Sequence, residues 1–110
     1  MGNVPRIAAF NDQFRKDPSR LGKVYVTDGV AAHGPEFVAR AMAATAAFDA
    51  FTTDNDPWGE RDFGSFLLDG ETLFWKIDYI DKVNPELGAE DPSNSTTTAR
   101  ILTIMLADEY

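Results

Sequence analysis

The segment Thr52–Ser65 (TTDNDPWGERDFGS) contains the densest group of side chains that could do chemistry. It places four carboxylates within nine residues, and Pro57 and Gly59 interrupt them: Asp54, Asp56, Glu60 and Asp62. Hard cations prefer oxygen ligands of this kind, and the spacing of Asp54, Asp56 and Gly59 partly matches positions 1, 3 and 6 of an EF-hand loop. One interpretation of the segment is therefore a divalent-cation site, or a metal-dependent enzyme built on it.

The EF-hand match fails at two ligand positions. Trp58 stands where an oxygen ligand is needed, and Ser65 replaces the bidentate Glu expected at position 12. A structural role is a second interpretation, because Asp54 or Asn55 can bond to nearby backbone and turn the chain. A binding surface is the third, formed by the four carboxylates together with Trp58.

The rest of the sequence lacks the residues of common catalytic centres. There is no cysteine and one histidine, which excludes thiolate zinc sites, iron–sulfur clusters and multi-histidine metal sites within one chain. No Gly-rich phosphate loop or nucleophile elbow is present. Asp62 and Asp78 could form an acid–base pair, but they are expected on opposite faces of a hairpin. We predict no catalytic residues and no cofactor.

The negative charge of the chain is concentrated in residues 49–110. The net charge is −8, and residues 49–110 contribute four basic against fourteen acidic residues, a net −10. Direct binding to nucleic acid or to anionic membrane is disfavoured, because both need a clustered basic face. A basic protein surface or a bound cation fits this field better. The uncharged stretch Ala41–Phe48 is far shorter than the roughly 20 residues that span a membrane, and Met1–Phe10 lacks a leader pattern, so we expect a cytoplasmic protein.

The helices and strands that position this segment are predicted from the spacing of apolar residues and from the positions of proline and glycine. Pro5 can begin a helix that Pro18 stops near Lys16. The β-branched run Lys23–Thr27 predicts a strand. Gly34-Pro35 opens a second helix, for which apolar residues at helical spacing predict the range 35–51.

Residues 62–81 contain the clearest hairpin signal. Asp69-Gly70 suits a two-residue type I′ turn, which predicts pairing of 63–68 with 71–80. In that register Gly64 lies opposite Trp75, where a missing side chain leaves room for an indole. The core face of the longer strand is then formed by Leu73, Trp75, Ile77 and Tyr79.

Residues 82–97 are polar and predict an exposed connection. The final apolar run, 99–107, fits either a buried strand or a short helix, and its β-branched residues favour a strand. The resulting order, α-β-α-β-β-β, predicts an α+β fold in which a small antiparallel sheet has two helices packed on one face. We expect one domain over residues 1–110.

Three motifs resemble one family of small bacterial proteins. FDAFTTDNDPWGERDFGSF, FWKIDYID and the final TTARILTIMLADEY are similar to its F-D-x-F-T-x-D-N-D-P-x-G-E-x-D-F-G, F-W-K-I-D-Y-Y-D and R-V-L-T-I-M-L-A-x-E-Y patterns, and Ile80 departs from the second tyrosine. The family is a domain of unknown function, mostly from alphaproteobacteria. The resemblance extends from Arg6 to Tyr110 and marks as signature positions Asp54, Asn55, Asp56, Pro57, Gly59, Glu60, Asp62, Phe63, Gly64, Trp75, Lys76, Asp78, Tyr79, Asp81, Asp91, Pro92, Arg100, Glu109 and Tyr110.

The resemblance implies no established activity, although members often look like accessory genes of plasmids and other mobile elements. We therefore expect a non-enzymatic acidic module that binds a basic protein surface. Its sharpest form is an accessory inhibitor that mimics the charge of nucleic acid. The expected partner-binding residues are Asp54, Asp56, Trp58, Glu60 and Asp62.

Overall fold

The computed structural model describes residues 3–110, so Met1 and Gly2 of the expected domain lie outside the described residues. Along the chain, the elements are α1 (Val4–Lys16), η1 (Pro18–Arg20), β1 (Gly22–Val26), α2 (Asp28–Ala31), α3 (Pro35–Ala47), β2 (Phe63–Leu68), β3 (Glu71–Asp81), β4 (Thr98–Leu106) and η2 (Ala107–Glu109). This is an α+β fold with the predicted order of its main elements. The short α2, η1 and η2 were not predicted.

The four strands form one sheet in the order β1-β4-β3-β2. The β2–β3 and β3–β4 pairs are antiparallel, as expected, and residues 98–106 are a strand. The expectation of a purely antiparallel sheet is wrong at one place, because β1 runs parallel to β4, with Val24 beside Leu102. The long connection from β1 to β4 contains α2, α3, β2 and β3, so it does not restrict β1 and β4 to an antiparallel pairing.

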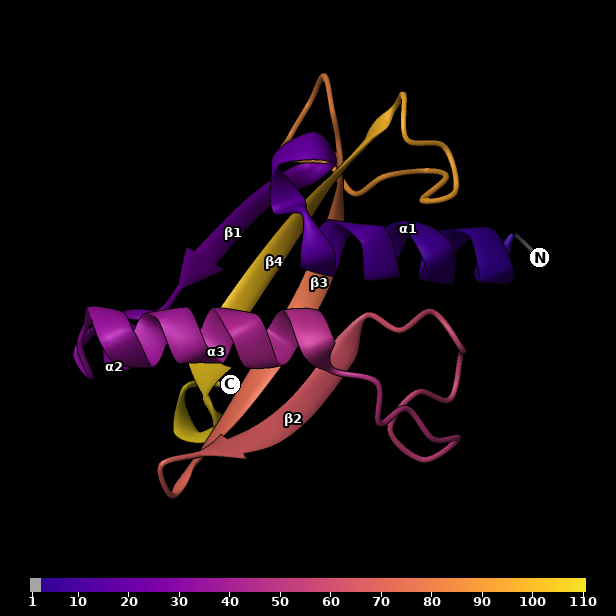
Figure 1. Cartoon of the computed structure of the whole chain (residues 1–110). Helices are drawn as coiled ribbons and strands as arrows, with labels where there is room; N and C mark the ends of the chain where they lie inside the picture. Colours follow the sequence, from indigo (N-terminus) through magenta and orange to yellow (C-terminus); the bar gives the residue numbers. More distant parts are fainter. Residues whose placement is uncertain (1–2) are drawn as a thin grey trace.

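Helices α1 and α3 lie across the same face of the sheet (Figure 1). Phe14 of α1 and Phe37 and Ala41 of α3 are buried against it. From the sheet, the core receives Leu73, Trp75, Ile77, Leu102 and Ile104. This confirms the predicted core face of the hairpin, on which Tyr79 is partly buried.

Helix α3 ends at Ala47, four residues before the predicted end at Phe51. Phe48 and Phe51 continue the helical spacing, but their rings instead pack edge-on against Trp75, with centroids 5.6 and 6.1 Å away. Arg15 of α1 bonds to two carbonyl oxygens at this end, those of Thr45 and Phe48. A tertiary contact thus ends the helix where the local pattern would extend it.

The hairpin has the predicted register. Asp69 and Gly70 both adopt positive φ, 52° and 82°, as a type I′ turn requires. Gly64 lies opposite Trp75, and a Cβ atom at position 64 would overlap the indole.

The helices within residues 3–110 are too short or too polar to span a membrane.

Candidate functional site

The acidic segment lies in the connection between α3 and β2, residues 48–62, which we call the acidic loop. Asn55 organises its first half. The side-chain oxygen of Asn55 accepts from the backbone N–H of Thr52 at 2.9 Å, while Asn55 N–H donates to Thr52 Oγ1 at 3.2 Å. Asn55 Nδ2 also donates to the carbonyl of Ala50 at 3.0 Å. These bonds form a local turn in which Asn55 has an architectural role.

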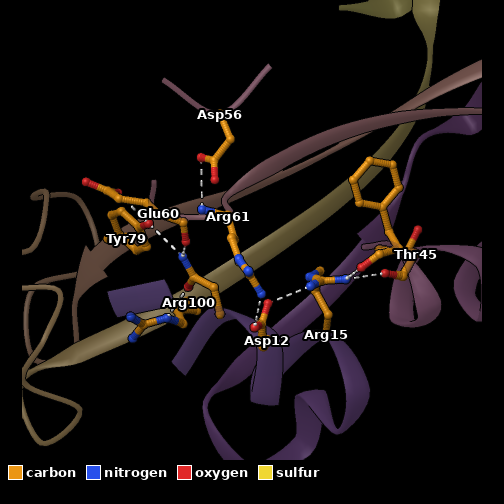
Figure 2. A network of polar contacts seen from close by, with 10 residues as sticks. Asp12, Arg15, Thr45, Asp56, Glu60, Arg61, Tyr79 and Arg100 are labelled. Carbon is orange, nitrogen blue, oxygen red and sulfur yellow. Dashed lines mark hydrogen bonds and ion pairs between the residues drawn. The ribbon is translucent and has the colours of Figure 1, made fainter. Parts of the chain in front are cut away.

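Asp56 and Arg61 organise the second half of the acidic loop. Arg61 has φ 58°, an unusual value for a residue with a side chain. Its backbone N–H donates to Asp56 Oδ1 at 3.1 Å, and its guanidinium donates to Asp12 of α1 at 2.9 Å. Asp56 and Asp12 therefore hold Arg61 in this conformation from both sides (Figure 2).

Asp12 connects the acidic loop to a second arginine, which is buried. Arg15 donates to Asp12 at 2.7 Å, and its guanidinium carbon lies 4.8 Å from the centre of the Trp75 ring. Arg15 also ends α3, as described above. The exit of α3, the acidic loop and α1 are thus linked through one ion-pair chain, Arg15–Asp12–Arg61.

Glu60 belongs to a second network, centred on Asn11 of α1. The hydroxyl of Tyr79 donates to Glu60 at 2.8 Å and accepts from Asn11 Nδ2 at 2.8 Å. Asn11 Nδ2 also donates to the carbonyl of Glu60 at 2.9 Å, and Asn11 Oδ1 accepts from Arg100 Nε at 2.7 Å. Burial, together with the negative charges of Glu60 and Asp62, raises the pKa of Tyr79, so the phenol is a neutral donor.

Arg100 is fully buried without a carboxylate bonded to it. It donates to the carbonyl of Pro92 at 2.7 Å and lies between the rings of Phe10 and Tyr79, 5.3 and 5.2 Å from their centres. Burial lowers the pKa of this guanidinium. Aromatic faces and oxygen dipoles here take the place of a directly bonded carboxylate, and the charge of Glu60 partly opposes the effect of burial.

Asp62 is half-buried at the entrance to β2. Its carbonyl accepts from the N–H of Ile77 at 2.8 Å, which extends the hairpin by one bond. The pKa of its carboxyl is raised, first by burial and then by the charges of Glu60, Asp56 and Asp78. Asp62 therefore carries its negative charge at a cost to the fold.

Two of the five expected binding residues remain exposed and take no part in these networks. The Asp54 side chain is exposed, and Trp58 is 80% exposed. Asp56 and Glu60 each use a side-chain oxygen for the loop itself. Of the five expected binding residues, Asp54 and Trp58 are therefore exposed to solvent, whereas Asp56 and Glu60 stabilise the acidic loop. Asp62 is half-buried.

The carboxylates do not come together as a metal cage. Within residues 3–110, no group of three or more His, Asp or Glu side chains is arranged to hold a metal ion. A shallow hollow of about 440 Å³ in the acidic loop is lined by Phe51, Thr52, Thr53, Asp56, Gly59 and Arg61. Its one carboxylate already faces Arg61, so the hollow offers no ligand set for a cation.

Sequence reasoning missed Asn11, Arg15 and the inward position of Arg100 as supports of the acidic loop. A signal existed for Asn11, which lies four residues after Ile7 and three before Phe14, on the apolar stripe of α1. A polar residue at such a position needs bonding partners inside the fold. The partners themselves come from the acidic loop and from β3 and β4, far along the chain.

One comparison with known proteins supports the coarser part of the resemblance, a family of unknown function. The model of one family, described as a protein of unknown function (DUF3768), matches residues 26–109. No curated protein and no solved structure matches the chain. Since the match extends over most of the chain, from the last residue of β1 through η2, the chain belongs to the DUF3768 family.

Proposed function

We propose that this protein is a non-enzymatic module that binds a basic protein surface through its acidic loop. The observation that carries the proposal is the exposure of Trp58, 80% of whose surface faces solvent. A tryptophan displayed in this way leaves a large apolar surface in water. Tryptophan is also among the residues most enriched at the energetic centres of protein interfaces.

The support beneath Trp58 favours recognition. The acidic loop is held by the Asn55 turn, the Asp56–Arg61 bond and the Glu60–Tyr79 bond. A loop fixed before binding loses little conformational entropy when a partner arrives. Asp54, exposed four residues before Trp58, adds a negative charge to the same loop.

The charge of the chain favours a basic partner. Residues 49–110 carry a net charge of −10, and such a field attracts basic surfaces and speeds their association. In its sharpest form, the proposal is that the partner processes nucleic acid and that the carboxylates occupy its phosphate-binding surface. An accessory role on a bacterial mobile element, in the cytoplasm, fits this form.

Affinity capture from the native host tests the proposal. Wild-type protein should retain a basic protein that the Trp58→Ala, Asp54→Asn double variant does not retain. The matched control is Val83→Ala, Glu86→Gln, which removes an equally exposed apolar side chain and one charge from the 82–97 connection. Equal capture by both double variants would refute the role of the acidic loop.

Once a partner is captured, its association rate can be measured at increasing salt. Asp54→Asn should slow association and reduce its salt dependence, because long-range charge chiefly steers encounter. Trp58→Ala should mainly speed dissociation, because an anchor residue acts after contact. An unchanged dissociation rate would show that Trp58 is not the anchor.

A further inference from the structure

Strand β2 forms one border of the sheet, and no strand within the described residues 3–110 lies along its outer edge. Ile77 N–H bonds to the carbonyl of Asp62, so Asp62 directs its backbone groups toward β3. Backbone direction alternates along a strand. Phe63, Ser65 and Leu67 therefore direct their N–H and C=O groups away from β3, along the free edge.

This edge lacks the features that usually prevent edge-to-edge pairing. Its six residues, FGSFLL, include no charge and no proline, and Leu67 is 73% exposed. Proteins commonly protect free edges with short strands or with lysine. The opposite border, β1, differs from β2 in carrying an exposed lysine, Lys23.

We propose that β2 pairs antiparallel with β2 of a second copy of this chain, about a twofold axis at Ser65. The two four-stranded sheets would then form one continuous sheet of eight strands. In this register Ser65 lies opposite Ser65 of the second copy, and Phe63 lies opposite Leu67. The outward backbone groups of Phe63, Ser65 and Leu67 then match those of the second copy as hydrogen-bonded pairs.

The side chains on the uncovered face support this register. Phe63 packs against Phe74 and Tyr110, with ring centroids 5.3 and 5.9 Å apart. Leu67 lies on the same face as Phe63, two positions away from Ser65 along β2. Pairing places the exposed Leu67 of each copy beside the aromatic cluster of the other, which removes apolar surface from water at both ends.

Charge complementarity also favours a second copy. Continued beyond the strand, the register brings Arg61 and Asp62 of one copy to the end that carries Arg40 and Asp69 of the other. Arg40 and Asp69 are joined at 2.6 Å and are about half exposed. At each end the basic side chains of Arg61 and Arg40 thus meet the acidic side chains of the other copy, which offsets part of the repulsion expected between two chains of charge −8.

The mass in solution tests the proposal first. Sedimentation equilibrium at micromolar concentrations should show a species of twice 12.1 kDa. Ser65→Lys places two ammonium groups at the axis and should raise the dissociation constant about tenfold or more. Tyr25→Lys, at an exposed site on β1, should leave it unchanged. A monomeric wild type, or a Ser65→Lys variant that dimerises equally well, would overturn the proposal.

Cross-linking tests the register, because the natural chain has no cysteine. Hydrogen-bonded antiparallel partners lie about 5.5 Å apart between Cα atoms, within disulfide range. Ser65→Cys should therefore form a disulfide dimer on mild oxidation. In Leu67→Cys the two thiols are four residues apart along the strands, roughly 13 Å, and no dimer should form. Efficient cross-linking of Leu67→Cys, or none of Ser65→Cys, would overturn the register.

Discussion

Trp75 packs its indole directly against Gly64, its partner on the neighbouring strand. The pair is aligned in the β2–β3 ladder, and the indole occupies the space in which a side chain at position 64 would stand. Trp75 is fully buried and receives Phe48, Phe51 and Arg15 on its other sides. Because Gly64 has no side chain, the Trp75 indole fits over β2. Through this ring the hairpin contacts both the start of the acidic loop and α1.

Gly64→Ala should destabilise the fold by about 1–3 kcal/mol, because the added methyl group forces the indole or the strand to move. Denaturant unfolding measures the loss as a lower midpoint at unchanged slope. Thr72→Ala is the control, since Thr72 is exposed on the neighbouring strand β3 and away from the free edge of β2. Equal stability of Gly64→Ala and wild type would show that the space over Gly64 is not limiting.

Truncation of the two tryptophans should change the stability of the fold by very different amounts. Trp75→Ala removes a fully buried ring and should cost about 3–5 kcal/mol. Trp58→Ala removes a ring that is 80% exposed, and the change should stay within about 0.5 kcal/mol. Urea melts of both variants measure the difference. Comparable losses would place Trp58 in the core and remove it from the binding surface.

Local signals predicted the hairpin because its register depends on neighbouring residues. Asp69-Gly70 accepts the two positive φ values of the turn, and the alternation along β3 then determines which side chains face the core. The end of α3 and the direction of β1 depend on partners far along the chain. Arg15 of α1 bonds to a carbonyl at the end of α3. Strand β1 pairs in parallel with β4, which is far from it in the sequence.

In the acidic loop, too, some features follow from neighbouring residues and others depend on residues far along the chain. Its position between helix and hairpin, and the turn-forming character of Asn55, follow from the sequence. The roles of Asp56 and Glu60 do not, because a carboxylate that bonds within the protein and one that faces a partner have the same sequence pattern. Only the places of Arg61 and Tyr79 distinguish them.

The Asn11 network should be strongly coupled. Asn11→Ala leaves Arg100 Nε and the Glu60 carbonyl without their partner, and each unsatisfied buried group costs about 1–3 kcal/mol. Tyr79→Phe should cost less, because it removes the donor to Glu60 and leaves the ring in place. A double-mutant cycle of the two changes should yield a coupling energy of about 0.5 kcal/mol or more. Strict additivity would contradict a shared network.

Glu109 should contribute stability that disappears in acid. Its carboxylate accepts from Thr27 Oγ1, Leu106 N–H and Gly29 N–H, and these bonds hold its pKa below the ordinary 4.5. Such a contribution is complete above the ordinary value and is lost as pH falls through the lower folded value. Glu109→Gln should therefore melt below wild type at pH 7, and the two proteins should converge near the bottom of the acid range. A constant difference at every pH would contradict this origin.

Asp62 should act in the opposite sense. Because its pKa is raised above the ordinary 3.8 by burial and by neighbouring carboxylates, the folded state holds its proton more tightly than the unfolded state does. Ionised Asp62 therefore weakens the fold increasingly as pH rises through the interval between the two values. Asp62→Asn should melt above wild type at pH 7, and the advantage should fade as wild-type Asp62 becomes protonated in acid. A lower melting temperature at pH 7 would show that the carboxylate has a partner that stabilises its charge.

The remaining carboxylates of the acidic loop complete the comparison. Asp56→Asn and Glu60→Gln should lower the melting temperature, because they weaken the bonds to Arg61 and Tyr79, whereas Asp54→Asn should leave it nearly unchanged. A millimolar divalent cation should shift the melting temperature of none of these three variants, nor of Asp62→Asn or wild type, since a ligand stabilises a fold only by binding its native state. A rise in the wild-type melting temperature with Ca²⁺, Mg²⁺ or Mn²⁺ that Asp54→Asn and Asp56→Asn abolish would instead establish the acidic loop as a cation site. The exposed carboxylate of Asp54 would then be a ligand of the cation, and the proposed protein-binding role of the acidic loop would be withdrawn.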